Sequence, residues 1–513
     1  MLFNSYLFIF VFLPTVMLGY HWLSARGRMA TTAWLVLCSL VFYGWWDIRF
    51  LPLLLASILV NYAIGRRIAR NRSKADLVLG LVFNLGILCY FKYAGLFTQT
   101  LSQLTGMDSL VVQVILPLGI SFFTFQKIAY LVDCYRGLTR PYDLAEFSLF
   151  VLFFPQLIAG PIIHHGEFVP QHLARDVSLR AEDVAVGLTL FTIGLFKKTI
   201  LAESMATYAS PMFDTAAAGQ AITFLEAWSG AIAFSLQLYF DFSAYSDMAI
   251  GLARLFGMRF PVNFDSPYKA TSIIDFWRRW HVTLSRFLKL YLYVPLGGNR
   301  KGTARRYINL LIVMLLGGFW HGANWTFLAW GGLHGLYLVA NHAWVAVRRK
   351  YVLRAPGPPA IWKVLAWGLT YLSVVVAWVF FRAADFPAAF NILSGMVAVE
   401  GRFVVTPAIA WALSFLPTVF DHMLISEKPL AFYEGARQVG MTLLVLAVAL
   451  LAPSSQEWLR HYRPTLEATP ARSWLARHVA WAPTPLWAIV TMALAIAGLL
   501  GTMRPTEFIY WQF

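Results

Sequence analysis

The stretch YINLLIVMLLGGFWHGANWTFLAWGGLHGLYLVANHAWV, residues 307–345, decides the fold of this chain. It contains no Lys, Arg, Asp or Glu, and basic clusters flank it at 300–306 and 348–354. Basic loops stay on the cytoplasmic side of a membrane. The stretch must therefore leave that side and return to it, which predicts a helical hairpin whose arms of roughly 15 residues each rise about 22 Å. His321 falls near the turn, so we expect it deep inside a membrane domain.

The composition of the whole chain also indicates a membrane protein. Of the 513 residues, 59% are hydrophobic and only 13% are charged, whereas soluble proteins carry about 25% charged residues. This excludes an ordinary cytosolic enzyme, a disordered protein and a secreted disulfide scaffold. We predict one polytopic membrane domain over residues 1–513, in which short or interrupted segments are re-entrant. Its apolar segments are 2–22, 30–46, 50–65, 77–93, 110–132, 144–163, 184–206, 223–252, 307–320, 324–345, 362–381, 405–420, 436–452 and 485–502.

The positive charge predicts the orientation of these segments. Lys and Arg number 41 against 25 Asp and Glu, a net charge of +16. Such an excess can indicate nucleic-acid binding, but here apolar runs separate the basic residues, which favours cytoplasmic loops and no nucleic-acid partner. The basic loops 26–28, 66–74, 136–140 and 253–306 are then inside. The N-terminus, with a retained first span, and the loop 209–222, which lacks Lys and Arg, are outside.

His321 is the first candidate for chemistry, in GGFWHGANW, residues 317–325. An ionisable side chain at membrane depth is costly and therefore a functional candidate, and histidine suits general acid–base catalysis near neutral pH. We expect Trp320 and Trp325 to form the walls of the site and Asn324 to orient the imidazole ring. The alternative is a core histidine bonded to a neighbouring carbonyl group.

A second candidate is DFWRRWHVTLSRFLKLYL, residues 275–292, whose spacing predicts an amphipathic helix along the cytoplasmic interface. His281 lies on its polar face, in either a structural or a site role. The basic side chains would cradle the phosphates of an anionic cofactor or, alternatively, contact lipid headgroups. These basic residues are Arg278, Arg279, Arg286 and Lys289.

Two further segments carry polar groups into apolar surroundings. Asp241, Tyr245 and Asp247 lie in QLYFDFSAYSDMAIG, residues 237–251, and buried carboxylates must be paired. We expect their partners among Arg278, Arg279 and His281, in a structural role or else in ligand positioning. The segment FPQLIAGPI, residues 154–162, is broken by Pro and Gly and should line a cavity. His164 and His165 follow it, but no matching ligand set is apparent in the sequence, so we predict no metal site.

Several long motifs resemble the membrane-bound O-acyltransferase (MBOAT) family, and within it the membrane subunit of bacterial alginate O-acetylation. The resemblance covers nearly the whole chain and is densest from about 116 to 340, and we predict a catalytic core over residues 116–345. The matching stretches are LPLGISFFTFQKIAYLVDCYRG (116–137), FPQLIAGPI (154–162), LYFDFSAYSDMAIGL (238–252), DFWRRWHVTLSRFLKLYLYVPLGGNRKG (275–302), MLLGGFWHGANWTFLAWGGLHG (314–335), WVFFRA (378–383) and FIYWQF (508–513).

The resemblance implies an all-α integral membrane protein, a multi-helix bundle with re-entrant or hairpin segments around a central cavity. It implies that His321 is catalytic and that His281 is the family's second position. It also implies a multi-pass enzyme of the bacterial inner membrane that transfers acetyl groups from cytosolic acetyl-CoA to a periplasmic acceptor for exopolysaccharide O-acetylation. Acetyl-CoA would be a substrate, with no cofactor bound permanently. The other partners would be membrane lipid, a periplasmic SGNH-type acetyltransferase or other acceptor protein, and exopolysaccharide pathway proteins.

Two alternatives remain open from the sequence. A related branch of the family transfers D-alanine from a carrier protein. A transporter of an anionic lipid or sugar, without acyl chemistry, would also suit the broken segment and the intramembrane carboxylates.

Overall fold

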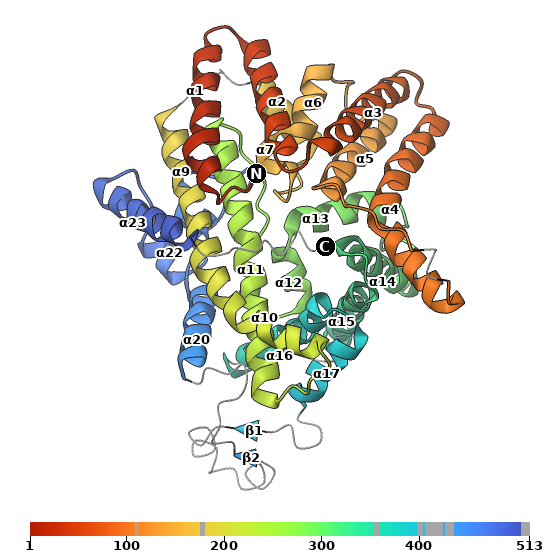
Figure 1. The fold of residues 1–513 in the computed structure, drawn as a ribbon, viewed down its shortest axis with the longest axis vertical. Coiled ribbons are helices and arrows are strands. Elements are labelled where there is room, and N and C mark those ends of the chain that lie inside the picture. The colour runs from red at the N-terminus through yellow and green to blue at the C-terminus, as the bar shows by residue number, and fades with distance from the viewer. Residues whose placement is uncertain are drawn as a thin grey trace.

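The computed structural model describes residues 1–107, 111–174, 180–351, 360–397, 404–405, 424–425 and 436–503. In these residues the protein is built almost entirely of helices, which confirms the predicted all-α class (Figure 1). The strands β1 (Val404–Val405) and β2 (Leu424–Ile425) form one short parallel pair. The predicted segment 405–420 lies outside the described residues except for Val405, and the motif at 508–513 lies wholly outside them.

The N-terminal helices, red to yellow in Figure 1, include the predicted broken segment. Phe153 ends α6 with non-helical backbone, α7 lasts one turn, and the chain then runs without regular structure to α8. All of residues 153–163 are buried, so this irregular backbone is enclosed by protein, as irregular backbone at membrane depth must be. The helices are α1 (Leu13–Ser24), α2 (Arg28–Gly44), α3 (Leu51–Asn71), α4 (Lys74–Thr105), α5 (Ile120–Arg136), α6 (Leu144–Leu152), α7 (Phe154–Leu157) and α8 (His165–Ala174), with short turns η1 (Phe8–Phe12) and η2 (Ile48–Phe50).

The centre of the molecule is α11 (Phe224–Leu255), which is buried along nearly its whole length. It packs against α9 (Ala181–Phe196), which continues through the π-helical turn η4 (Lys197–Ala202) into α10 (Glu203–Ala217). Glycine permits the close approach: a Cβ on Gly187 would lie 2.8 Å from the carbonyl oxygen of Gly251, and one on Gly251 would lie 2.6 Å from that of Gly187. Any larger residue at either position would force the two helices apart.

The predicted hairpin is present as α14 (Gly302–His321) and α15 (Trp325–Tyr351), which lie side by side in Figure 1. Glycine again sets the spacing, because a Cβ on Gly318 would lie 2.3 Å from the carbonyl oxygen of Phe327. His321 is the last residue of α14, so the turn between the two arms holds it in place.

The prediction of one continuous helix over 275–292 is wrong. The segment forms α12 (Ile273–Arg279), α13 (Val282–Leu288) and the π-helical turn η6 (Lys289–Tyr293), with a break at Trp280 and His281, where His281 has φ +42°. The break is held by tertiary backbone bonds: Val282 N donates to the carbonyl of Asn263 at 2.9 Å, and Asp265 N donates to the carbonyl of Arg279 at 2.9 Å. The local helical pattern gives way to this pairing because Trp280 and His281 are both buried.

The remaining elements complete a membrane domain. Helices long and apolar enough to cross a bilayer are Ile48–Asn71, Lys74–Thr105, Ala181–Ala217 and Ala360–Arg382, and shorter apolar helices are Phe8–Ser24, Arg28–Gly44, Arg437–Leu451 and Pro485–Gly501. All eight overlap segments predicted from the sequence. The other elements are the 3₁₀ turn η5 (Pro267–Lys269), α16 (Ala360–Arg382), α17 (Phe386–Met396), α20 (Ala436–Leu451), α21 (Ser455–Trp458), η7 (Arg460–Tyr462), α22 (Trp474–His478) and α23 (Pro485–Gly501).

Candidate active site

His321 is buried and surrounded by aromatic rings. Its ring centroid lies 4.8 Å from that of Trp320, 5.1 Å from that of Trp330 and 5.2 Å from that of Phe381. The wall predicted from Trp320 and Trp325 is therefore half right. Trp325 is 40% exposed and donates its indole N–H to Thr100 Oγ1 at 3.3 Å, so it faces away from this cage.

Two cavities reach His321 from different elements. The larger has a volume of about 660 Å³ and lies among α12, α13, η6 and the α14–α15 hairpin. The smaller has a volume of about 90 Å³ and lies among Trp46, Lys92, residues 116–122 and Ile158–Ala159 of the broken segment. His321 lines both cavities, and their linings share no other described residue.

The larger cavity is basic. Its lining includes Arg278, Lys289, Arg300 and Arg306, and no Asp or Glu among the described residues lines it. Guanidinium and ammonium groups without carboxylate neighbours favour a polyanionic ligand such as a phosphate ester. The structure thus brings Arg278 and Lys289 into the space that His321 also lines, as the phosphate-cradle hypothesis requires.

The other two predicted phosphate ligands are engaged elsewhere. Arg279 binds Asp275 at 3.0 Å. Arg286 makes a two-pronged ion pair with Glu167, at 2.5 and 2.8 Å, and lines a different cavity of about 20 Å³. The structure therefore does not bring Arg278, Arg279, Arg286 and Lys289 together, because Arg279 and Arg286 are paired with carboxylates and do not line the larger cavity.

His281 is fully buried and lines neither cavity. A hydrogen-bond network fixes its ring. Asn263 donates its amide N–H to Ser246 Oγ at 3.0 Å, so its Oδ1 is the acceptor for Thr283 Oγ1 at 2.9 Å and for His281 Nδ1 at 3.0 Å. His281 Nδ1 therefore carries the proton. The ring centroid lies 6.3 Å from that of Trp320, which places His281 behind the wall of the His321 site.

Asn324 does not occupy the predicted place beside the imidazole. Its side-chain amide donates to the carbonyl of Ala384 at 2.6 Å, and its Oδ1 accepts from Thr326 N at 3.1 Å. The amide thus links the start of α15 to the connection between α16 and α17. Asn324 caps a helix here, which is a common role for asparagine.

The carboxylates of α11 are paired, but not with the predicted partners. Lys198 lies 2.8 Å from Asp241 and 2.7 Å from Glu203, and Lys197 lies 2.8 Å from Asp247. Asp247 also accepts from Gln456 at 2.8 Å and from Ser455. Arg278, Arg279 and His281 take no part in these pairs. Tyr245 stacks on Phe3 with ring centroids 4.7 Å apart, so this whole set is part of the packing of the bundle.

Sequence reasoning missed Lys92, which lies on α4 and lines the smaller cavity. Its Nζ donates to the carbonyl of Trp320 and, at 3.2 Å, to the carbonyl of His321. The neighbouring Tyr93 donates its hydroxyl to the carbonyl of Phe319 at 2.9 Å. These bonds satisfy carbonyls at the end of α14 that have no partner within the helix. A lone lysine in the apolar run 77–93 was the available signal.

Comparisons with known proteins agree with this architecture. A model of the MBOAT, membrane-bound O-acyltransferase family, matches residues 72–381. The chain is 43% identical to a peptidoglycan O-acetyltransferase of Helicobacter pylori, over 83% of this chain and 85% of the other. It is 43% identical to a probable alginate O-acetylase AlgI of Pseudomonas aeruginosa, over 77% and 75%, and 37% identical to one of Pseudomonas putida over the full length of both chains.

Proposed function

The chain belongs to the membrane-bound O-acyltransferase family and is an O-acyltransferase, and we propose that it transfers acetyl groups from cytosolic acetyl-CoA to a periplasmic acceptor hydroxyl. The product would be an O-acetylated exopolysaccharide of the alginate kind, made at the bacterial inner membrane. Relatives that bear the names of alginate and peptidoglycan O-acetylating enzymes support polysaccharide O-acetylation as the pathway.

One observation carries the proposal: His321 lines both cavities. The larger cavity is formed largely by the loop 253–306 and the hairpin, and the charge pattern predicts that this loop is cytoplasmic. The smaller cavity is bounded by Trp46 and residues 116–122. The nearby loops 47–49 and 96–109 carry one basic residue between them, Arg49, so the same charge pattern predicts that they are outside. An acyl donor entering from one side and an acceptor entering from the other would thus meet at a single imidazole.

The chemistry follows from these positions. Arg278, Lys289, Arg300 and Arg306 would hold the phosphates of acetyl-CoA, with its thioester directed toward His321. His321 would take the proton from the acceptor hydroxyl while that oxygen attacks the thioester carbonyl. The C–O bond of the ester forms, the C–S bond breaks, and the proton passes from His321 to the leaving thiolate of CoA. The cage of Trp320, Trp330 and Phe381 would exclude water and limit hydrolysis of the thioester.

The acceptor hydroxyl belongs to the glycan or to a periplasmic protein that passes the acetyl group on. A periplasmic SGNH-type acetyltransferase fits the second route, since the smaller cavity of about 90 Å³ admits a side chain or a single hydroxyl-bearing group more readily than a polymer. Other proteins of the exopolysaccharide pathway would then supply the glycan.

The test uses membrane vesicles of defined orientation. Inside-out vesicles that contain the protein should cleave radiolabelled acetyl-CoA added outside, while sealed right-side-out vesicles should not. His321→Ala should reduce cleavage by about 10²–10⁴-fold, the usual contribution of a general base. His478→Ala, an exposed histidine on α22, is the matched control and should behave as wild type.

Full cleavage by His321→Ala would contradict the proposal, as would equal cleavage in both vesicle orientations. Transport without thioester cleavage would favour the transporter alternative. Replacing acetyl-CoA by a D-alanyl carrier protein in the same vesicles tests the other alternative, and transfer from the carrier protein alone would overturn the choice of donor.

A further inference from the structure

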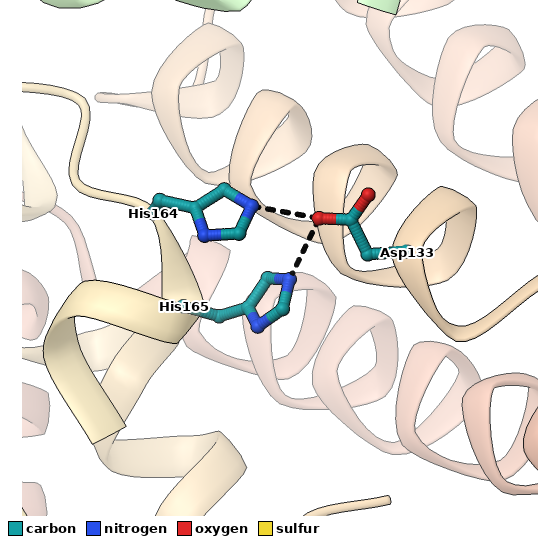
Figure 2. A group of neighbouring side chains, drawn as sticks. All are labelled: Asp133, His164 and His165. Atoms are coloured by element: carbon teal, nitrogen blue, oxygen red, sulfur yellow. Dashed lines mark hydrogen bonds and ion pairs between the residues drawn. The ribbon is translucent and has the colours of Figure 1, made fainter. Parts of the chain in front are cut away.

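Asp133, His164 and His165 converge on one point at the boundary of α5 and α8 (Figure 2). The Nε2 atoms of His164 and His165 lie 2.7 and 3.0 Å from the same carboxylate oxygen, Asp133 Oδ2. The hydroxyl of Tyr291, from η6, lies 2.7 Å from that oxygen and 2.9 Å from His164 Nε2. Three chain segments thus bring four heteroatoms together, although His164 and Asp133 are 31 residues apart in sequence.

More polar groups surround the carboxylate oxygen Asp133 Oδ2 than it can bind by hydrogen bonds. Three donors approach a single carboxylate oxygen, which has two lone pairs in its plane. The other oxygen, Oδ1, lies 4.0 Å from the guanidinium of Arg136. Asp133 and His165 are buried, so this crowding is not relieved by solvent. Two imidazole nitrogens, a carboxylate and a phenol form a donor set typical of a transition-metal site.

We propose that Asp133, His164 and His165 bind a divalent transition-metal ion, with Zn²⁺ as the preferred ion and Tyr291 or water as the fourth ligand. A tetrahedral zinc site with bonds of about 2.1 Å places its ligand atoms about 3.4 Å apart. The present separations of 2.7–3.0 Å therefore need to open by a few tenths of an ångström. Side-chain rotation at His164 can supply that opening, because its side chain is 29% exposed.

The groups around the ligands fit this assignment, with one cost. The hydroxyl of Tyr142 lies 2.8 Å from His165 Nδ1 and can accept a hydrogen bond from it. In that tautomer the lone pair of Nε2 is free to bind a metal. Gly166 N, in contrast, donates to His164 Nδ1 at 3.1 Å. A metal on His164 Nε2 puts a proton on Nδ1 and displaces that bond, and because Gly166 is exposed, water can replace it.

The cluster borders a small space and joins three chain segments. His164 and Tyr291 line the cavity of about 20 Å³ beside Arg286, so two of the proposed ligands face an open space. A bound ion would link the end of α5, the start of α8 and η6. Because η6 begins with Lys289, which lines the larger cavity, the ion would fix one wall of the proposed donor site. With Tyr291 as the fourth ligand, the protein would supply all four ligands, as in structural zinc sites, and with water it would supply three.

Metal content of the purified full-length protein tests the proposal. Protein treated with a chelator and then dialysed against Zn²⁺ should retain about one equivalent per chain by elemental analysis. With Co²⁺ in place of Zn²⁺ it should show the visible absorption of a tetrahedral site. Asp133→Ala and His165→Ala should lose both signals. His172→Ala is the matched control, because His172 lies on the same helix and binds Thr32 Oγ1 at 2.8 Å, away from the cluster.

Tyr291→Phe separates a direct ligand from a neighbour: a blue-shifted or weaker Co²⁺ spectrum supports Tyr291 as the fourth ligand, and an unchanged spectrum supports water. If Asp133→Ala fails to fold, the wild-type protein still decides, since an ion that binds only the folded state raises its thermal unfolding midpoint. No Zn²⁺ uptake and no rise of the midpoint in wild type would overturn the proposal. So would equal metal content in wild type and the ligand variants.

Discussion

Two buried polar regions of this protein are satisfied in opposite ways. Between η4, α10 and α11, the buried charges are paired, Lys198 with Asp241 and Glu203, and Lys197 with Asp247. Around the His321 site, Nε2 of His281 and the indole N–H groups of Trp320 and Trp330 have no hydrogen-bond partner among the described residues. An unpaired buried polar group costs about 1–3 kcal/mol. We infer that the paired charges of the first region hold the helices together and that the second region serves catalysis.

The largest expected effect is on stability, in the paired region. Lys198→Met leaves the buried carboxylates of Asp241 and Glu203 without their cation. Removing one partner of a buried ion pair costs about 3–5 kcal/mol, so the free energy of unfolding should fall by about that amount. Acetyl transfer per folded molecule should not change. Thermal unfolding in detergent and an activity assay normalised to folded protein measure the two quantities.

A compensating variant sharpens this result. Adding Asp241→Leu and Glu203→Gln to Lys198→Met removes the uncompensated charges and should restore much of the lost stability. If Lys198→Met kept wild-type stability, or if it lost turnover per folded molecule, the proposed difference between the two regions would be wrong.

The next effect is on catalysis, in the unpaired region. His281 has φ +42°, a conformation that asparagine tolerates well. In His281→Asn the backbone break should persist, and the new amide can donate to Asn263, but the ring behind Trp320 is gone. We expect kcat to fall about 10- to 100-fold, the equivalent of about 1.4–2.7 kcal/mol, with an unchanged KM for acetyl-CoA and little loss of stability.

A fall in kcat with unchanged KM distinguishes a His281 that positions the site from one that only packs in the core. A merely structural His281 would lower the amount of folded enzyme and leave kcat intact. His478→Asn, on the exposed face of α22, controls for the loss of a histidine elsewhere.

The contrast between these regions also shows which features of the structure could be predicted from the sequence. The hairpin and the burial of His321 at its turn were predictable, because an uncharged run lies between two basic clusters in the sequence. The ion pairs were not, since Lys198 and Asp241 lie on different helices and nothing local relates them. The lysine pair at 197 and 198, within the apolar run 184–206, was the available signal.

The break at His281 was hidden for a different reason. Residues 275–292 have a clear helical period, and only the backbone bonds of Asn263 and Asp265 to this segment interrupt it. One ion pair could have been anticipated from this segment, because Arg279 stands four residues after Asp275, a spacing typical of an ion pair within a helix. Of the proposed metal ligands, His164 and His165 stood out in the sequence as a pair, but Asp133 could not be related to them, because it precedes His164 by 31 residues and α6 and α7 lie between.

A smaller effect should separate the basic residues that line the larger cavity from those already paired. Arg278→Ala removes one cation from the cavity and should raise the KM for acetyl-CoA by about tenfold, since a hydrogen bond to a charged group contributes about 1.5–3 kcal/mol. Steady-state kinetics at several salt concentrations measure this. Arg279→Ala is the matched control on the same helix, and an equal rise of KM in the control would contradict the assignment.

The smallest effect concerns Asn324, which lies in the same sequence motif as His321 but caps the start of α15 in the structure. Asn324→Ala removes the side-chain oxygen that accepts from Thr326 N and should destabilise the protein by about 1 kcal/mol, the usual value of a helix cap. The transfer rate should stay at the wild-type level. Asn324→Asp retains an acceptor for Thr326 N and should recover part of the stability. If catalysis needed the amide group, Asn324→Asp would not recover the rate. If both variants lost transfer at wild-type stability, Asn324 would contact the substrate, and the chemistry at His321 would extend to the turn of the hairpin.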